Sequence, residues 1–317
     1  MHKRLLRVSP KTVPLYPDAL EDFLAVKAAA GRAAVTLADY RRHVAAFFSE
    51  EGSPETEADL RRSVLAHMQR RTGMAPASFN LRLSYLRGFF RWCVREGLLV
   101  QDPTREVHKR ADEGRPRRAA EDTLRRLLDL PDKRTWSGLR DYTLLVFLLD
   151  TGARPSEALG LIPADLDLGA LQVTIPAGIA KTRRSRVLPV LPVTAAALRK
   201  LLAHRPDALS PSMPIFCTAY GLPLGRHGFA RRMAAYGRTL GAPVRPYDLR
   251  HAFALLFLRG GGDAFALQRM LGHSSLAMTR RYVDLADTDL KRSHDAASPL
   301  NRLVGPGGSK LRGPRRP

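Results

Sequence analysis

Residues 271–283 read LGHSSLAMTRRYV and place His273 nine residues ahead of Tyr282. Leu276 and Val283 lie on the same predicted helix as the tyrosine, so a packed core side chain is the ordinary interpretation of Tyr282. The spacing of one imidazole and one phenol is a weak signal when it stands alone. Its meaning depends on two arginine-bearing segments further upstream.

The first of these segments, TGARPSEALGL, spans residues 151–161. Gly152 ends one predicted helix, and Arg154 stands before Pro155 at the start of the next, with Glu157 in its first turn. An arginine at the positive end of a helix is unfavourable unless an anion joins it, and helix amides with a guanidinium bind phosphate well. The segment indicates either a phosphate site or a local Arg154–Glu157 pair.

The second segment, PYDLRH at 246–251, opens another predicted helix. Its apolar stripe should be buried and leave Tyr247, Arg250 and His251 on the opposite side. The stripe consists of Leu249, Phe253, Leu256 and Phe257. A phenol and a guanidinium would then face a common space. His251 could act as a ligand or a base, but a histidine beside an apolar helix face is more often structural, so we predict a supporting role.

The charge of the chain points to a polyanionic partner. Its 317 residues carry 52 Lys and Arg against 30 Asp and Glu, a net charge of +22. A field this positive attracts polyanions, and nucleic acid is the first candidate. A GC-rich genome that favours arginine throughout is the competing explanation. The length predicts two globular units.

Composition also restricts the compartment and the cofactors. Cys93 and Cys217 stand in apolar surroundings, which excludes a disulfide framework and a cysteine metal site. The basic N-terminus lacks an apolar region of signal-peptide length, and the longest apolar run, residues 144–149, is too short to span a bilayer. No carboxylate cluster accompanies the arginines, so a Mg²⁺ mechanism is not required. We expect a cytoplasmic, nucleoid-associated protein without metal or other cofactor.

Residues 14–103 predict an N-terminal domain of four helices, with turns near Gly31, residues 52–54 and residues 73–76. Helical spacing is clearest in the last helix, whose apolar residues should be core. They are Phe79, Leu83, Leu86, Phe90 and Val94. Arginines occupy the other faces of this helix, where phosphate contact and plain solvation are equally good interpretations.

A basic segment follows this domain. Residues 104–118 contain Pro, Gly and repeated basic residues without an apolar period, and so predict an interdomain linker. The end of the chain, residues 301–317, is also rich in Gly, Pro and basic residues and predicts a disordered tail.

Residues 119–300 predict a second domain that is mostly helical. Helices are expected at 121–130 and 139–150, and the segments after the sheet are helical in pattern. Residues 171–175 and 186–190 predict two strands of a small antiparallel sheet, joined by the basic loop AGIAKTRRS. The fold class is therefore mainly α, with a minor α+β element.

Taken in order, these segments resemble the tyrosine recombinase (phage integrase) family, most of all its Xer-like bacterial members. The resemblance covers most of residues 15–290 and includes TLADYRRHVAAFF, SFNLRLSYLRGFFRWCVREGLLVQDPT and AKTRRSRVLPV. It implies a SAM-like four-helix domain that clamps DNA, joined to a tyrosine-recombinase catalytic domain. The implied activity is site-specific recombination, as in integration, excision or resolution.

The resemblance also implies a role for each matching residue. Arg154 and Arg250 would clamp the nonbridging oxygens of the scissile phosphate while Tyr282 attacks, leaving a 3′-phosphotyrosyl link and a free 5′-hydroxyl. Lys181 would protonate the departing oxygen, and Glu157 would help hold the first arginine. Guanidiniums suit the spread charge of a phosphoryl transition state. The phosphotyrosyl bond conserves the energy of the phosphodiester, so rejoining needs no nucleotide cofactor.

Tyr247 departs from the family pattern because most members carry a histidine at this position. A neutral phenol, with a pKa of about 10, can donate a hydrogen bond to phosphate but is a poor proton acceptor at neutral pH. His273 matches the position that supports the phosphate. Two hypotheses follow: His273 or the phosphate itself takes the proton of Tyr282 while Tyr247 only supports, or the enzyme is slow.

Double-stranded DNA is the expected partner, contacted by arginines of both domains. These are Arg41, Arg82, Arg87, Arg91, Arg183 and Arg184. The resemblance implies that the segment after Tyr282 docks on a neighbouring protomer to give a tetramer on DNA, although an intramolecular cap is an alternative. A partner recombinase or accessory protein could take part. Two rival functions stay open: a noncatalytic DNA-binding protein on the same fold, and type IB topoisomerase-like strand relaxation.

Overall fold

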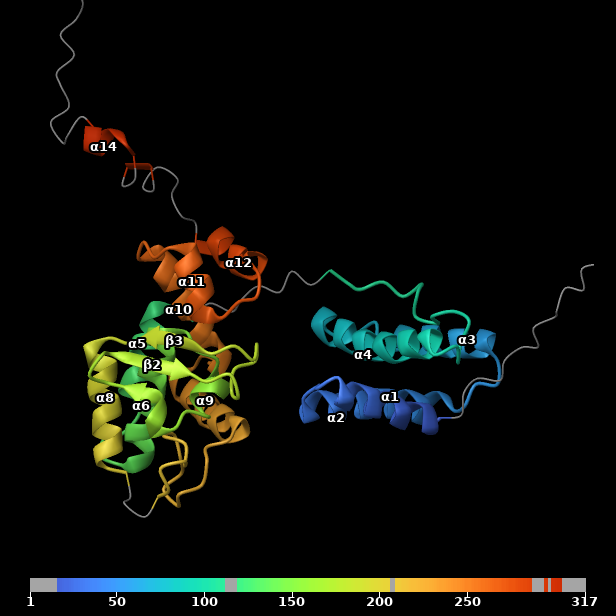
Figure 1. The fold of residues 1–317 in the computed structure, drawn as a ribbon, viewed down its shortest axis with the longest axis horizontal. Coiled ribbons are helices and arrows are strands. Elements are labelled where there is room, and N and C mark those ends of the chain that lie inside the picture. Colours follow the sequence, from blue (N-terminus) through green and yellow to red (C-terminus); the bar gives the residue numbers. More distant parts are fainter. Residues whose placement is uncertain (1–15, 112–118, 206–208, 287–293, 296–297, 304–317) are drawn as a thin grey trace, which may run out of the picture. The chain divides into compact units, whose positions relative to one another are not determined.

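The chain forms two compact units in a computed structural model, Met1–Arg115 and Pro116–Pro317 (Figure 1). The structure describes residues 16–111, 119–205, 209–286, 294–295 and 298–303. Each unit has its own hydrophobic core. The predicted tail at 301–317 lies outside the described residues except for its first three positions. No helix in the described ranges is long and apolar enough to cross a membrane.

Four helices build the first unit over its described residues, as predicted. They are α1 (Asp18–Ala29), α2 (Ala34–Glu51), α3 (Glu57–Gln69) and α4 (Pro76–Arg95). Figure 1 shows α4 lying alongside the pair α1 and α2, whose residues it contacts. Aromatic rings fill the centre: Phe23 packs edge-to-face on Phe89, and Phe47 on Phe90. The stripe predicted on α4 is buried except for Val94, which is half-buried.

The segment 104–110 packs on α4, although its composition predicts a linker. The Arg87 guanidinium donates to the carbonyl of Val107, whose side chain is buried in the core of this unit. The Asn80 side chain accepts from the amide of Arg110 and donates to its carbonyl, both at 2.8 Å. Side chains thus satisfy a backbone that forms no regular structure, which composition alone does not reveal. The division between the two units falls at residues 115 and 116.

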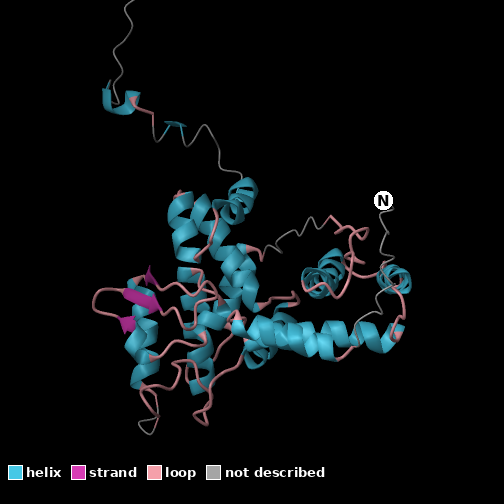
Figure 2. Cartoon of the chain, turned by 45° about the vertical axis from the view of Figure 1, so that its right-hand side comes forward, coloured by secondary structure: helices cyan, strands magenta, loops and turns pink. Residues whose placement is uncertain are grey.

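The second unit is mostly helical with one small sheet. Its elements are α5 (Glu121–Asp129), α6 (Trp136–Thr151), α7 (Pro155–Ala158), a 3₁₀ turn η1 (Pro163–Asp165), β1 (Leu166–Asp167), β2 (Gln172–Ile175), β3 (Arg186–Pro189), α8 (Pro192–Ala203), α9 (Arg226–Leu240), α10 (Pro246–Arg259), α11 (Ala264–Leu271), α12 (Leu276–Ala286) and α14 (Leu300–Leu303). The strands pair antiparallel in the order β1-β2-β3, and Figure 2 shows them as a small sheet at one edge of this unit. The predicted hairpin is confirmed; β1 was not predicted, because two residues show no alternation.

Helix α6 runs through the core of the second unit and packs against α8 and α10. It ends at Gly152, whose φ of 63° is left-handed. A Cβ at this position would lie 2.1 Å from Cδ1 of Phe253, so the turn requires glycine for both conformation and space. The turn sends the chain directly into Arg154 and α7.

Helix α10 is buried on more than one side, and the predicted one-sided stripe is wrong in this respect. Leu249 and Phe253 are buried as expected, but Leu256 and Phe257 are only half-buried. Arg250, predicted on the opposite side, is 1% exposed. The reason is a second apolar cluster, in which α11 and α12 cover that side of α10.

Candidate active site

The first arginine of the site sits at the N-terminus of α7. Arg154 is the N-cap, and Oε2 of Glu157 accepts from its backbone amide at 3.1 Å while Oε1 accepts from Nη1 at 3.0 Å. The local pair that the sequence left as one alternative is therefore present. Nη2 of Arg154 donates to the carbonyl of Gly272 at 3.4 Å, so the guanidinium also reaches the end of α11.

The second arginine is held by backbone carbonyls. Arg250 donates from Nη1 to Gly152 O and from Nη2 to Leu271 O, each at 2.8 Å. Its Nε is buried and has no hydrogen-bond partner in the described part of the protein. Burial, and then the charge of Arg154, lower the pKa of Arg250 to about 10. A guanidinium without a carboxylate partner of its own favours an anion.

The C-terminal end of α11 supplies two of these acceptors. The helix ends at Gly272, which is left-handed with a φ of 61°. The last carbonyls of a helix lack intrahelical partners and form the negative end of its dipole, so they suit cationic donors. Leu271 O and Gly272 O accept from Arg250 and Arg154 respectively. Backbone geometry therefore sets where both guanidiniums lie.

A third arginine, Arg186 of β3, joins this group and was not predicted. It donates from Nη2 to Oε2 of Glu157 at 2.6 Å and from Nε to the carbonyl of Met270 at 2.9 Å. Burial alone raises the pKa of the Glu157 carboxyl, but the hydrogen bond and charge of Arg186, with help from Arg154, outweigh it and hold the pKa below its ordinary value. Glu157 is therefore an ionised carboxylate that two arginines share.

The tyrosine of the opening stretch meets a histidine of α10. The Tyr282 hydroxyl lies 2.7 Å from Nδ1 of His251, and the tyrosine is 6% exposed. Burial lowers the pKa of His251; Asp248 opposes this shift and Arg281 adds to it. Burial raises the pKa of Tyr282, which the charge of Arg250 partly offsets. A neutral imidazole therefore faces a protonated phenol at neutral pH. No local pattern indicates this contact, because the two residues are 31 positions apart.

His273 contacts Arg250 and Thr279. Its Nε2 lies 3.1 Å from Nη2 of Arg250, and its Nδ1 lies 2.9 Å from Oγ1 of Thr279. Because a guanidinium has no acceptor, Nε2 must accept, and the single proton of a neutral ring is then on Nδ1 and is donated to Thr279. Burial, with the charge of Arg250 next, lowers the pKa of His273 to about 4. The ring is thus neutral and holds the second arginine.

Tyr247 and Lys181 lie at the margin of this group. Tyr247 is 46% exposed, and the centre of its ring is 6.0 Å from the Arg250 guanidinium carbon and 5.2 Å from the ring centre of His251. Lys181 is exposed, and its backbone amide donates to Oε1 of Glu157 at 3.4 Å. Within the described residues, neither the phenol nor the ammonium has a hydrogen-bond partner.

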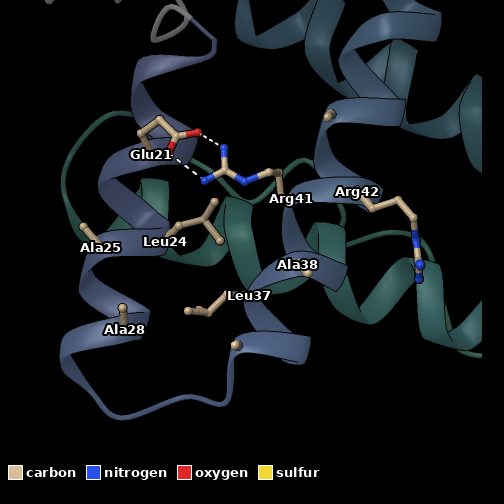
Figure 3. A pocket seen from close by; sticks show the side chains of 10 residues that line it. Glu21, Leu24, Ala25, Ala28, Leu37, Ala38, Arg41 and Arg42 are labelled. Carbon is tan, nitrogen blue, oxygen red and sulfur yellow. Dashed lines mark hydrogen bonds and ion pairs between the residues drawn. The ribbon is translucent and has the colours of Figure 1, made fainter. Parts of the chain in front are cut away.

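The arginines expected to contact DNA occupy different surroundings. Arg41 forms a two-pronged ion pair with Glu21 beside a cavity of about 640 Å³ between α1 and α2 (Figure 3). Arg87 donates to the carbonyl of Val107, and Nε of Arg91 donates to Oδ2 of Asp102 at 3.3 Å. The other three are half-buried (Arg82) or exposed (Arg183 and Arg184). Internal partners therefore already engage Arg41, Arg87 and Arg91.

One group of side chains has the spacing of metal ligands in the described part of the chain: Glu50, Glu51 and His67. Both carboxylates are ion-paired, Glu50 with Arg71 and Glu51 with Arg70. This group belongs to the first unit, whereas Arg154, Arg250 and Tyr282 belong to the second. It is best explained as an ion-paired cluster that joins α2 to α3 and the turn after it.

Comparisons with known proteins show the family of this chain. The model of the phage integrase family matches residues 117–289. The tyrosine recombinase XerC of Rhodospirillum centenum (strain ATCC 51521 / SW) is 35% identical over 240 residues, 74% of this chain and 69% of the relative. That of Methylobacterium sp. (strain 4-46) is 34% identical over 306 residues, 92% and 89% of the two chains. The chain belongs to the phage integrase family. Within that family it is a Xer-like tyrosine recombinase, a class of site-specific DNA recombinases.

Solved structures support the fold. A Tn1549 transposon integrase in complex with a circular intermediate DNA has a TM-score of 0.69 at 18% identity and covers 86% of this chain and 99% of its own. A lambda integrase dimer bound to a COC′ core site has a TM-score of 0.64 at 17% identity and covers 82% and 96%. At these identities the likeness concerns architecture, which agrees with the helical units described above.

Proposed function

We propose that this recombinase cleaves and rejoins DNA through a 3′-phosphotyrosyl intermediate formed on Tyr282. The observation that carries the proposal is the 2.7 Å contact between the Tyr282 hydroxyl and His251 Nδ1, directly beside Arg250 on α10. A buried phenol next to a neutral imidazole, with a guanidinium nearby that has no carboxylate partner, is suited to attack on a phosphodiester. A packed core tyrosine would need none of these neighbours.

In the proposed cleavage step, the oxygen of Tyr282 attacks phosphorus and its proton passes to Nδ1 of His251. The bond between phosphorus and the 5′-oxygen breaks, and the ammonium of Lys181 gives that oxygen its proton. Arg154 and Arg250 neutralise the charge that spreads over the nonbridging oxygens. The products are a phosphotyrosyl strand end and a free 5′-hydroxyl.

Rejoining is the same step in reverse. A 5′-hydroxyl from the same or another duplex attacks the phosphotyrosine and gives its proton to the Lys181 amine. The phenolate of Tyr282 leaves and recovers its proton from His251. One phosphoester is exchanged for another at each stage, so no nucleotide is consumed.

The geometry favours His251 over His273 as the proton acceptor. Nε2 of His273 already accepts from Arg250, and its Nδ1 carries the proton shared with Thr279. We assign His273 to holding Arg250, and Tyr247 to donating a hydrogen bond to the phosphate. The departure from histidine at position 247 then leaves the route of the Tyr282 proton intact.

Assembly into a tetramer on DNA is part of the proposal. An apolar cavity of about 630 Å³ opens between α6, α10 and the start of α8, lined by Val146, Leu191, Val193 and Phe257 among others. Leu300 and Leu303 of α14 are 61% and 77% exposed. We propose that the C-terminal segment of a neighbouring protomer fills this cavity. Both units and the net charge of +22 would hold the complex on the nucleoid, where a partner recombinase or accessory protein could join it.

The test is covalent capture. Purified protein is incubated with nicked duplexes from DNA flanking its own gene, and adducts are resolved on a denaturing gel for the wild type, Tyr282→Phe and the control Tyr220→Phe, an exposed tyrosine elsewhere in the unit. We expect an adduct with the wild type and the control and none with Tyr282→Phe. Tight binding without an adduct on any duplex would establish a noncatalytic DNA-binding protein. Relaxation of any supercoiled plasmid by monomers would indicate a topoisomerase.

A further inference from the structure

Arg186 occupies the base of the loop that carries Lys181. It is the first residue of β3 and pairs with Ile175 of β2, so the hairpin loop spans residues 176–185. Its side chain is 11% exposed, whereas the next residue, Val187, is 54% exposed. Side chains alternate along a strand, so Arg186 points toward the interior although it borders a basic, exposed loop.

Three successive carbonyls at the end of α11 each accept from a different arginine. Met270 O accepts from Arg186, Leu271 O from Arg250 and Gly272 O from Arg154. Two of these arginines are the proposed phosphate ligands. The third comes from the hairpin, so one helix end carries both the phosphate ligands and the base of the Lys181 loop.

Glu157 also connects the Lys181 loop to the proposed phosphate ligands. Its carboxylate accepts from Arg154, from Arg186 and from the backbone amide of Lys181. The Glu157 carboxylate therefore binds the loop at Lys181 and again at Arg186, where the loop ends. All three nitrogens of Arg186 have acceptors within the protein, at Glu157 and Met270 O. Three of its five N–H donors are therefore engaged within the protein, and its charge faces the Glu157 carboxylate.

We propose that Arg186 is a positioning residue that sets Lys181 against the scissile phosphate by tying its loop to Glu157 and to the end of α11. The inference rests on the proposed function of Lys181 as the acid for the 5′-oxygen. Arg186 would then affect protonation of the leaving 5′-oxygen through Lys181, and would not stabilise the phosphate directly. The guanidinium donates to the carboxylate and to the carbonyl from different nitrogens held in one plane, which the single nitrogen of lysine reproduces only in part.

The test compares two nicked substrates that differ at one atom. One has the natural 5′-oxygen at the scissile bond, and the other has a bridging 5′-sulfur. A thiol has a pKa of about 8.5, so a thiolate leaves without an acid. Single-turnover cleavage is measured with the full-length wild type, Arg186→Met, Arg186→Lys, Lys181→Ala and Arg199→Met. The last is a matched control, because Arg199 is an exposed arginine that also donates to a backbone carbonyl.

With the natural substrate, Arg186→Met should be slower than the wild type by about 10²-fold or more, the usual contribution of a general acid. With the sulfur substrate, it should come within about tenfold of the wild type. Arg186→Lys should show the same pattern with a smaller defect, and it carries the test if the methionine variant does not fold. Arg199→Met should match the wild type on both substrates.

Equal defects on both substrates would overturn the inference, because Arg186 would then act on the phosphate or on folding. Normal cleavage of the natural substrate by Arg186→Met and Arg186→Lys would overturn it as well. Failure of the proposed function gives a different result: no adduct with the wild type, or a Lys181→Ala defect that sulfur does not relieve.

Discussion

The Tyr282 hydroxyl lies 2.7 Å from Nδ1 of His251, and His251 directly follows Arg250 on α10. One helix therefore holds both the group that contacts the proposed nucleophile and an arginine proposed to contact the phosphate. Consecutive residues on a helix point about 100° apart, so the two side chains would reach different atoms of the proposed reacting centre. The covering helices α11 and α12 make this possible because they enclose that side of α10.

Replacing His251 by Gln should slow single-turnover cleavage of a nicked duplex by about 10²- to 10⁴-fold, because the phenol loses its proton acceptor. Binding to the same duplex should change little. His204→Gln is the control, since that histidine is exposed at the end of α8. A His251→Gln rate close to that of the wild type would remove His251 from the proton route.

The pH dependence of cleavage should have an acid limb below the ordinary histidine pKa of about 6.5. Burial lowers the pKa of His251, so the ring stays neutral and able to accept a proton down to a lower pH. Below its pKa the ring is an imidazolium, and cleavage should fall. Rates at subsaturating DNA should locate this limb, and His251→Gln should lack it. A midpoint above 6.5 would contradict the assignment.

Replacing Glu157 by Gln should reduce the free energy of unfolding by about 3–5 kcal/mol at neutral pH, because Arg154 and Arg186 lose their shared counter-charge. The pKa of Glu157 is depressed in the folded protein. The stabilisation is therefore present above the unfolded carboxyl pKa of about 4.3 and is lost as pH falls through the lower folded value.

Urea unfolding at neutral pH and below pH 4 measures this difference. The control is Glu121→Gln, which removes an exposed carboxylate 3.6 Å from Arg125. Wild type and Glu157→Gln should converge at the acidic end. A constant gap between them at all pH values would show that the carboxylate charge is not the source of stability.

Replacing Gly152 by Ala should destabilise the protein more than replacing Gly241 by Ala. Both glycines are left-handed helix ends, with φ of 63° and 65°, so each alanine pays about 1–2 kcal/mol of backbone strain. At Gly152 the new Cβ would also lie 2.1 Å from Phe253, whereas nothing lies within 4 Å at Gly241. Overpacking adds about 1–3 kcal/mol. Equal losses in urea unfolding would refute the close contact.

Removing the Tyr247 hydroxyl should slow cleavage by about tenfold or more, the loss expected when a hydrogen bond to a charged group is removed. Tyr247→Phe measures this directly, with Tyr220→Phe as the control. Tyr247→His should cleave at a rate close to that of the wild type, because in the proposed mechanism His251 already accepts the proton of Tyr282. A large gain in Tyr247→His would show that the natural site is impaired at this position.

The sequence predicts most helices and the position of Arg154, because these features depend on residues close together in the chain. Helical spacing predicts the four helices of the first unit, and Gly152 followed by Pro155 predicts the position of Arg154. The burial of Arg250 and the contact of His251 with Tyr282 depend on α11 and α12 folding back over α10, which no local pattern encodes. Arg186 was missed for the same reason, since within its own strand it is one more basic residue.

The end of α11 holds arginines through main-chain oxygens, and every residue type carries such an oxygen. Substitutions at Met270 and Leu271 therefore leave these acceptors in place as long as the helix stops at the same residue. The position where the helix stops depends on Gly272, whose left-handed φ of 61° ends α11 there. In evolution, side chains at positions 270 and 271 can drift with the core around them, while an insertion or deletion of one residue in α11 would misplace all three arginines together.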